Sequence, residues 1–521
     1  MGRRHRIGRV PAGRTALVLL ALLARGPAHA QINPAPAPAP APVPAAATAP
    51  SPPLGGLTIA PVTVAGPWDS TIRLEFYNRL RGEFVDWFAT PNPGPTQHFR
   101  YNFIGNKLQV GLRLTRDPLE VFAQFQDTSL GDVPANAVGV GATYYQNTRS
   151  ATQNGAFLRQ GWASVKRLFG VDGAFVKGGR QIYSDALEAP VRNKDLRWLQ
   201  VNRFSQRLLG PFDYTHVGRS FDGGQIGYGS DKINFTAFGF VPTYGGFEVD
   251  ANRELDIDVA GAALSLPDSS ELGTTFGRLF LIYYDDFRDV LFLDNRPLAE
   301  RQATKGKPAK LYTVGANFAH LFEHAGPGFV DALAYGYGQF GDYQTLSQSA
   351  WAFGLEAGYK WTEAWAQPWM RVGIDSASGD PDPTDDQHQT FFQMLPTAWV
   401  YAQFPFYNMM NNQDVFVQWI LDPHPRASFR LDLHWLRVNS SQDLAYFGGG
   451  ATKNDFFGFG GVPAKGRYEL AYLVHGMLTL RPTEFFTVNA FYAHAFGQGV
   501  IEANFNGRQG NYGFLEGIVA F

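Results

Sequence analysis

Short segments in which apolar and polar residues alternate recur from about residue 70 onward, and this pattern limits the possible folds more than any other feature of the chain. In residues 71–81, for example, Ile72 and Leu74 alternate with Arg73 and Glu75. Because successive side chains of a β-strand point to opposite faces, each such segment has one apolar and one polar face. The same alternation recurs in residues 107–114, 428–435 and 467–475.

About 18 such segments can be counted, an even number within the range of bacterial outer-membrane barrels. A soluble sandwich would expose the polar faces to solvent, whereas a membrane barrel turns them toward its lumen. The expected strands are residues 70–81, 99–114, 118–128, 156–167, 173–183, 219–229, 232–242, 257–266, 276–287, 311–322, 329–341, 350–361, 367–376, 413–422, 426–438, 467–481, 484–496 and 510–521.

The last segment and the composition favour the membrane barrel. Residues 510–521 end on Phe521, with Leu515 and Val519 on the same face, which resembles the C-terminal signature that outer-membrane barrels present to the barrel-assembly machinery. Aromatic residues make up 15% of the chain although its mean hydropathy is −0.19, a combination typical of a barrel that contacts lipid outside and water inside. We therefore predict an all-β fold: a monomeric, antiparallel transmembrane β-barrel of about 18 strands in the bacterial outer membrane, with a water-filled polar lumen.

The first 66 residues are expected to lie outside the barrel. Residues 1–30 combine a basic start, an apolar run at 16–24 and a small-residue site at 28–30, which indicates a secretory signal peptide. The alternative, a transmembrane anchor, would need about 20 apolar residues. Residues 31–66 are a Pro/Ala-rich periplasmic linker, or else a proline motif that binds a periplasmic partner. The barrel is expected to occupy residues 67–521.

Charge and cysteine content narrow the class of protein. Six of the 44 Lys and Arg residues and none of the 46 Asp and Glu residues lie in residues 1–30, so the remaining chain has a net charge of about −8. That balance disfavours a nucleic-acid partner, and any attraction for an anion must come from a local group of arginines. The chain has no cysteine, so it has neither disulfides nor thiolate chemistry.

Motifs for catalysis and for metal binding are scarce. The chain lacks G-x-S-x-G, Walker A and H-E-x-x-H sequences, and its G-x-G-x-x-G match at 336–341 falls inside an expected strand. The acidic residues 375–386 form either a solvated loop or a site for a divalent cation without EF-hand spacing. The eleven histidines show no ligand spacing. We therefore predict no metal site, no cofactor and no enzymatic activity.

The long connections are expected to be extracellular loops, because periplasmic turns of such barrels are short. One or two of them should fold inward and narrow the pore, and residues 195–209 could form an amphipathic turn or strand near the opening. Trp361, Trp365 and Trp369 suit the aromatic girdle of a barrel, or else ordinary packing. The expected loops are residues 82–98, 129–155, 184–217, 289–309, 377–412 and 439–466.

Several motifs resemble those of the alginate export family of outer-membrane proteins. Leu158-Arg159-Gln160 and Gly179-Arg180-Gln181 are similar to its consecutive strand motifs. Residues 210–223 resemble its G-P-x-D-W-x-N-x-x-R-x-F-D-G stretch, with Tyr214 and His216 in place of Trp and Asn. Residues 377–380 and 390–397 are similar to a further segment, and the resemblance runs in order over about residues 70–521.

This resemblance implies an 18-stranded monomeric barrel with an arginine-rich constriction through which an acidic polysaccharide leaves the periplasm. Arginines would lower the barrier to a polyanion, or would alternatively form structural salt bridges without selectivity. Simple alternation places Arg180 on the same face as Val176, so a lumen position would need a β-bulge, and the parity of Arg159 is similarly ambiguous. The expected pore-lining residues are Arg73, Arg100, Arg113, Arg159, Arg180, Arg219, Asp222, Arg371, Arg430 and Glu516.

The expected function is passive export of an anionic, alginate-like polysaccharide, with outer-membrane lipid as the surroundings. One alternative is an uptake porin for small acidic solutes of the uronate type. A second is an outer-membrane hydrolase, which would require His216, Ser220 and Asp222 to meet within hydrogen-bonding distance. A third is a structural barrel with a sealed lumen.

Overall fold

The computed structural model describes residues 62–91, 97–189, 191–268, 274–323, 326–397, 402–405 and 407–521. The chain divides into two units, Met1–Val43 and Pro44–Phe521, and every described residue belongs to the second. The signal peptide and the linker up to residue 61 therefore lie outside the described residues. Of the described helices, none has the length and apolarity needed to cross a bilayer.

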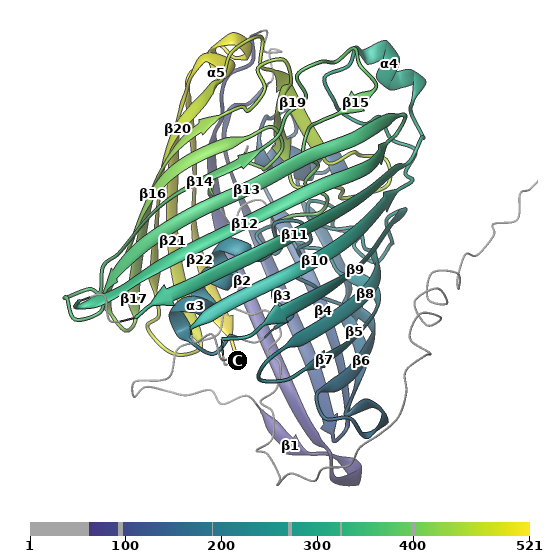
Figure 1. Cartoon of the computed structure of the whole chain (residues 1–521), viewed down its shortest axis with the longest axis vertical. Helices are drawn as coiled ribbons and strands as arrows, with labels where there is room; N and C mark the ends of the chain where they lie inside the picture. Colours follow the sequence, from purple (N-terminus) through teal and green to yellow (C-terminus); the bar gives the residue numbers. More distant parts are fainter. Residues whose placement is uncertain are drawn as a thin grey trace, which may run out of the picture. The chain divides into compact units, whose positions relative to one another are not determined.

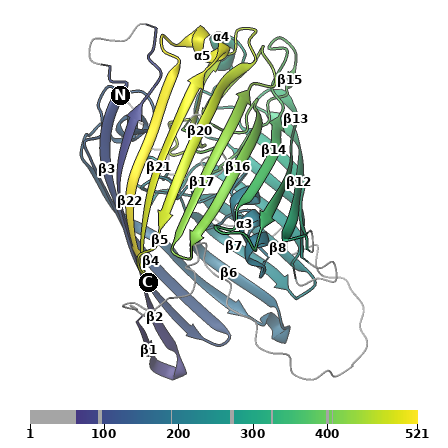
Figure 2. The same ribbon diagram turned by 90° about the vertical axis from the view of Figure 1, so that its left-hand side faces the viewer.

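Eighteen antiparallel strands form a closed barrel, in which each strand pairs with the next and β22 pairs with β2 (Figures 1 and 2). The first nine are β2 (Thr71–Asp86), β3 (Arg100–Arg116), β4 (Leu119–Gly131), β5 (Gln153–Lys166), β6 (Ala174–Gln181), β7 (Phe221–Gly229), β8 (Asn234–Pro242), β9 (Ile257–Leu266) and β10 (Thr275–Asp286). The others are β11 (Ala309–Phe322), β12 (Gly328–Tyr343), β13 (Leu346–Trp361), β14 (Trp369–Ala377), β16 (Gln413–His424), β17 (Ala427–Arg437), β20 (Glu469–Leu480), β21 (Phe486–Gly497) and β22 (Gln509–Ala520).

Each of the 18 expected segments overlaps one of these strands, so the predicted barrel is confirmed. The largest difference is at β2, which continues to Asp86 although residues 82–98 were expected to be a loop. Alternation persists there, because Glu83 and Val85 are buried inside the barrel while Leu80 is exposed on its outer face. Residues 63–65, inside the expected linker, form a short strand, β1 (Thr63–Ala65), that pairs with the start of β2.

The outer face of the barrel carries large exposed apolar side chains. Leu112, Phe125, Leu279, Leu355 and Leu515 lie on five different strands and are 55–63% exposed. Water would not tolerate so wide an apolar surface on a monomeric protein, whereas lipid does. The apolar residues of the alternating segments therefore face lipid and the polar residues face the lumen, as expected.

Long connections all lie at one end of the barrel, as the expected extracellular loops require. They contain α2 (Val140–Thr148), α3 (Lys194–Leu199), the π-helix η3 (Gln200–Phe204), α4 (Leu298–Ala303), β15 (Gln387–His388), β18 (Leu444–Gly448), β19 (Phe459–Pro463) and α5 (Gly499–Asn504). Two one-turn helices, η1 (Pro67–Asp69) and η2 (Leu168–Gly170), lie outside these loops. At the opposite end, strands are joined by short connections, such as the two residues between β16 and β17.

Register shifts change the face of particular residues. Gln124 of β4 pairs with Gln160, and the next residue, Phe125, pairs with Leu158, so Arg159 is the extra residue of a bulge. As a result both Arg159 and Gln160 are buried on the inner side. A second shift, between Leu436 and Arg437, buries Leu470, which simple alternation had placed on the outer face.

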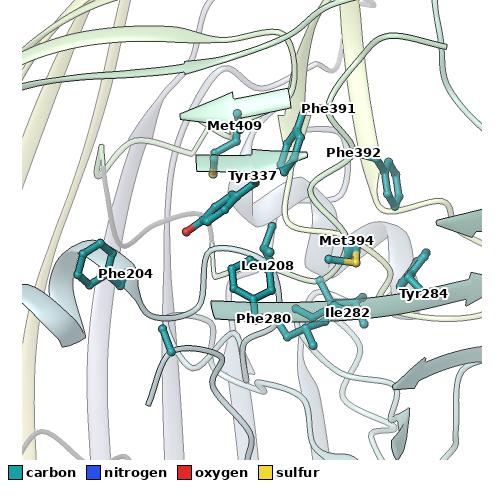
Figure 3. Close-up of a cluster of buried hydrophobic side chains, with 14 of the residues drawn as sticks. Phe204, Leu208, Phe280, Ile282, Tyr284, Tyr337, Phe391, Phe392, Met394 and Met409 are labelled. Carbon is teal, nitrogen blue, oxygen red and sulfur yellow. The ribbon is translucent and has the colours of Figure 1, made fainter. Parts of the chain in front are cut away.

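Apolar side chains fill part of the lumen. Described residues of the connection 182–220, which we call the inward segment, and of the loop 378–412 pack there against the inner faces of β10 and β12 (Figure 3). Phe204 and Leu208 of the inward segment join Phe280 and Tyr337 of the wall in one buried cluster. The lumen was expected to be polar and water-filled, but this part of it is filled by apolar side chains, because inward-facing Phe and Tyr residues on the strands pack against the loops.

Candidate functional site

The inward segment begins with the short helix α3, and its start is fixed locally. The side chain of Asn193 accepts hydrogen bonds from the backbone N–H groups of Asp195 and Leu196, as an N-cap residue does. The π-helix η3 continues α3 and carries Arg203. Residues 195–209 were expected to form an amphipathic turn or strand, and the structure instead has helix there, α3 followed by η3.

One group of cations on the wall surrounds residues 213–215 of the inward segment. Arg79 donates hydrogen bonds to the three backbone carbonyl oxygens there, at 3.0, 3.3 and 2.7 Å. Nζ of Lys107 lies 3.1 Å from Oδ1 of Asp213, and Nη2 of Arg159 lies 2.7 Å from the same oxygen. These three cations are 4% exposed or less, so the inward segment covers them.

Arg81 completes this group. Its Nη1 donates to the carbonyl oxygen of Tyr214 at 2.8 Å, and its Nε donates to Oε2 of Glu516 at 2.7 Å. Glu83 lies 3.6 Å from Arg81, and Glu516 lies 3.8 Å from Arg79. We call Arg79, Arg81, Lys107 and Arg159 the basic wall.

Burial and neighbouring charges set the protonation of the inward segment. Burial alone would raise the pKa of Asp213, but Arg159 and Lys107 hold that pKa below its usual range. Burial lowers the pKa of His216 to about 4, although Oε1 of Glu83 accepts a hydrogen bond from its Nε2 at 2.7 Å. At neutral pH the inward segment therefore presents one anion and a neutral imidazole to the basic wall.

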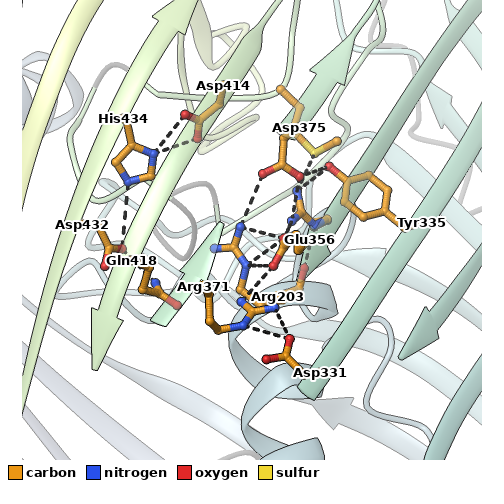
Figure 4. A network of polar contacts seen from close by, with 12 residues as sticks. Arg203, Asp331, Tyr335, Glu356, Arg371, Asp375, Asp414, Gln418, Asp432 and His434 are labelled. Atoms are coloured by element: carbon orange, nitrogen blue, oxygen red, sulfur yellow. Dashed lines mark hydrogen bonds and ion pairs between the residues drawn. The ribbon is translucent and has the colours of Figure 1, made fainter. Parts of the chain in front are cut away.

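A second group of charges holds α3 and η3 on the other side of the lumen (Figure 4). Nε of Arg203 donates to both carboxylate oxygens of Glu356 at 2.9 Å, and Nη2 of Arg207 lies 3.3 Å from Asp375. Arg371 bridges Glu356 and Asp331, each at 2.9 Å. Three guanidinium groups thus face three carboxylates, and all six side chains are buried.

Most of the expected pore-lining residues face the lumen. Arg73 lies directly opposite Arg113 on neighbouring strands and is exposed, whereas Arg113 binds Glu75 at 2.8 Å. Arg219 lies on the inward segment and donates to the carbonyl oxygen of Gly449 at 2.9 Å. Four more expected residues point inward. The three arginines among them each bind a carboxylate, and the glutamate binds Arg81: these residues are Arg159, Arg371, Arg430 and Glu516.

Three of the expected residues face outward, and for them the prediction is wrong. Tyr101 is buried on the inner face of β3, so its neighbour Arg100 points to the outer face. The side chain of Arg100 is 75% exposed and forms an ion pair with Asp86. Arg180 and Asp222 lie directly opposite each other and form a bidentate ion pair. Nε of Arg180 donates to Oδ1 of Asp222 at 2.7 Å, and its Nη2 donates to Oδ2 at 2.6 Å. No register shift separates Arg180 from Val176 in the pairing of β5 with β6, so simple alternation holds and Arg180 stays on the outer side.

Sequence reasoning missed the members of the basic wall other than Arg159. Alternation had already placed Arg79, Arg81 and Lys107 on polar faces, so parity was the signal that could have singled them out. Arg203 and Arg207 gave no such signal, because Glu356 and Asp375 lie far away in the chain, 153 and 172 positions from Arg203.

The residues of the possible hydrolase triad and those of the acidic stretch are bound to other partners. His216, Ser220 and Asp222 form no triad: they bond Glu83, the carbonyl oxygen of Arg159 and Arg180, respectively. Within the acidic residues 375–386, Asp375 binds the arginines of the inward segment, while Asp382 accepts from Thr384. In the described part of the chain this acidic stretch does not gather three ligand atoms around one point.

A family model described as alginate export matches residues 328–467. This part of the chain runs from β12 to β19 and contains Asp331, Glu356, Arg371 and Asp375, the wall side of the second charge group. No curated protein matches the sequence of the chain.

Solved structures of porins share the fold. OccK2 of Pseudomonas aeruginosa is 9% identical, with a TM-score of 0.52, over 86% of this chain and 98% of that chain. A BenF-like porin from Pseudomonas fluorescens Pf-5 is 10% identical, with a TM-score of 0.55, over 87% and 98%. OpdK of Pseudomonas aeruginosa, solved with vanillate, is 10% identical, with a TM-score of 0.50, over 86% and 98%. The barrel architecture and the family match together identify the chain as a bacterial outer-membrane β-barrel protein that carries the alginate export family's pattern at residues 328–467.

Proposed function

We propose that this protein is a gated outer-membrane channel for anionic carbohydrate, with export of a uronate-type polysaccharide as its main role. The observation that carries the proposal is the way the basic wall is capped. Backbone carbonyl oxygens of residues 213–215 and a single carboxylate, Asp213, occupy the donors that an acidic sugar would use. Arginine binds carboxylates strongly and in a fixed fork, so these donors suit uronate groups.

The charge balance supports residues 211–217 as the part of the inward segment that would move. The basic wall has four cations, and its acidic neighbours on the strands are Glu83 and Glu516. Withdrawal of residues 211–217 would remove Asp213 and leave four cations against two carboxylates. A surface with this excess of positive charge would attract a polyanion. Glu83 and Glu516 would keep the attraction weak enough for the polyanion to be released.

The other half of the inward segment serves as the anchor. Arg203 and Arg207 are tied to Glu356 and Asp375 by buried charge-assisted bonds, which are stronger than bonds to neutral carbonyl oxygens. Residues 193–207 therefore stay in place when residues 211–217, which we call the gate, move. Withdrawal of the anchor as well would leave three carboxylates around Arg371, a surface that repels anions.

Uptake of small acidic solutes is the second candidate. It is favoured by the structures of OccK2 with glucuronate and of OpdK with vanillate, two ligands that each carry a carboxylate. The same basic wall would serve solutes that move inward, so chemistry alone does not choose the direction.

Transport assays separate these candidates. In proteoliposomes we expect glucuronate to enter faster than glucose, and we expect the preference to fall when Arg79, Arg81 and Arg159 are changed to Gln. Arg100→Gln is the matched control, because Arg100 points outward. A strain without the protein should lose secretion of its acidic polysaccharide. Normal secretion combined with lost growth on uronates would instead support uptake, and an unchanged glucuronate preference in the triple variant would refute the basic wall.

A further inference from the structure

A compact group of possible metal ligands lies on the inner faces of β17 and β20, apart from both charge groups described above. It consists of Asp432, His434 and His475, which are 4% exposed or less. Nε2 of His475 lies 3.1 Å from Nε2 of His434 and 3.4 Å from Oδ2 of Asp432. The remaining edge of this triangle, from Nε2 of His434 to Oδ2 of Asp432, measures 3.9 Å.

The strand register creates this group. Asp432 lies directly opposite His475, and His434 follows two positions later on the same face of β17. Side chains on one face of neighbouring strands approach closely enough to share a ligand. The two histidines are 41 positions apart in the chain, which explains why spacing in the sequence gave no sign of a site.

Hydrogen bonds around the two imidazoles leave lone pairs facing each other. Nδ1 of His434 lies 2.8 Å from a carboxylate oxygen of Asp414, which can only accept, so Nδ1 carries the proton and Nε2 a lone pair (Figure 4). The backbone N–H of Gln403 donates to Nε2 of His475 at 3.4 Å, so this nitrogen is also an acceptor. Two nitrogen lone pairs and a carboxylate oxygen therefore converge, and a cation between them would remove their repulsion.

The spacing fits a tetrahedral ion. Zinc binds imidazole nitrogen at about 2.0–2.1 Å and carboxylate oxygen at about 2.0–2.2 Å, which places tetrahedral ligand atoms roughly 3.3–3.5 Å apart. The three observed edges, 3.1, 3.4 and 3.9 Å, bracket that value. Asp414 holds the ring of His434 through its other nitrogen, as carboxylates do behind metal-bound histidines.

We propose that Asp432, His434 and His475 form a binding site for a divalent cation of the zinc type inside the barrel. Nε of Arg430 donates to both carboxylate oxygens of Asp432, at 3.0 and 2.8 Å, and Gln418 donates to Oδ2 at 3.0 Å, so the carboxylate is held in one orientation and the cation would share Oδ2 with these donors. We assign the fourth ligand to Gln403, because its backbone N–H contacts His475 and its side-chain Oε1 is buried with no hydrogen-bond partner among the described residues. Metal binding would then link the wall strands β17 and β20 to the loop 378–412.

Metal analysis of the full chain tests this proposal. The protein is folded in detergent, stripped with EDTA, incubated with zinc chloride and desalted, and its zinc content is measured by mass spectrometry. We expect about one zinc ion per chain, and at least a tenfold loss of affinity in His434→Ala and in His475→Ala. His424→Ala is the matched control, because His424 is exposed at the end of β16, and it should bind zinc normally.

X-ray absorption at the zinc edge of the unmodified protein keeps the test decisive if a variant fails to fold. We expect a four-coordinate shell of nitrogen and oxygen with the scattering pattern of two imidazoles. Absence of stoichiometric zinc, a shell of water oxygens alone, or equal zinc binding by His475→Ala would overturn the proposal. In that case a second proton on one imidazole would account for the close contact.

Discussion

Arg371 shows how a single side chain supports the lumen wall. It bridges Asp331 and Glu356 inside the barrel, and none of the three side chains is exposed. Glu356 also binds Arg203, whereas Asp331 has Arg371 as its ion-pair partner and Trp369 as a further donor. Loss of Arg371 would therefore leave the charge of Asp331 buried and uncompensated.

We predict that Arg371→Ala lowers the free energy of unfolding by about 3–5 kcal/mol, the usual cost of breaking a buried ion pair from one side. Arg100→Ala, which removes an exposed pair, should change it by less than about 1 kcal/mol. Urea unfolding in detergent micelles, followed by tryptophan fluorescence, measures both. Equal losses in the two variants would show that the internal network contributes no more than a surface pair.

At the residue scale, the alternation of side chains along a strand predicted the face of a residue better than resemblance to family motifs did. Alternation placed Arg79, Arg81 and Lys107 on the polar face, where the structure finds them. The motif that contains Arg180 suggested a lumen residue, although its parity with Val176 correctly indicated the outer face. Arg159 could not be assigned either way, because a bulge is a property of two paired strands and the sequence shows only one of them.

The gate is the element on which the proposed function depends, and Gly105 offers a way to displace it. A Cβ atom at Gly105 of β3 would lie 2.3 Å from the ring of His216, much closer than side chains can approach. The added methyl group would push His216 away from Glu83 and lift residues 213–217 from the basic wall.

We therefore predict that Gly105→Ala raises single-channel conductance several-fold in planar bilayers while the barrel stays folded. Gly82→Ala is the matched control, because Gly82 lies on neighbouring β2 and a Cβ atom there would meet nothing within 4 Å. Wild-type conductance in Gly105→Ala, with retained barrel mobility on gels, would argue against a gate at residues 211–217.

The contact between loops 378–412 and 438–468 should depend on pH. Asp443 accepts from the backbone N–H of Asp380 at 2.9 Å and from the hydroxyl of Thr390 at 2.5 Å. Burial raises the pKa of Asp443 to about 6, and burial together with the charge of Asp443 raises that of Asp380 to about 7. Both values exceed those of the unfolded chain, so the contact is favoured by low pH and weakens as both groups ionise between pH 5 and 8.

Hydrogen exchange at the amide of Asp380 checks this expectation. After correction for the intrinsic exchange rate, we expect protection to fall as the pH rises from 5 to 8. Asp443→Asn should reduce the fall in protection without removing it, because only Asp380 can still ionise in that variant. Protection that is constant in the wild type, or that rises with pH, would contradict the assignment of these two carboxyl groups.

Among the elements, strands were far more predictable than loops. The two faces of a strand can be recognised from the alternation within one segment of sequence. The ends of the 18 strands were therefore predicted to within a few residues. The inward segment was expected only as a possibility, since its position depends on Arg203 and Arg207 finding Glu356 and Asp375 across the barrel. The filled part of the lumen was missed because inward-facing Phe280 and Tyr337 look like ordinary strand residues in the sequence.

At the scale of the whole molecule, the strands form the wall of the barrel. In the proposed channel, the position of the inward segment determines which charged side chains of that wall are exposed to the lumen. One half of the segment is anchored by buried ion pairs on β13 and β14. The other half covers four cations on β2, β3 and β5. In the proposed channel, this asymmetry would let the gate move while the anchor stays bound to the wall.

The most direct test of this account is the reversal potential of Gly105→Ala channels under a potassium chloride gradient. With the gate displaced, the exposed basic wall should give a reversal potential of the sign that marks chloride selectivity. The added changes Arg79→Gln, Arg81→Gln and Arg159→Gln should abolish that selectivity. A cation-selective Gly105→Ala channel, or a chloride selectivity that survives the three neutralisations, would contradict the claim that these cations choose the solute.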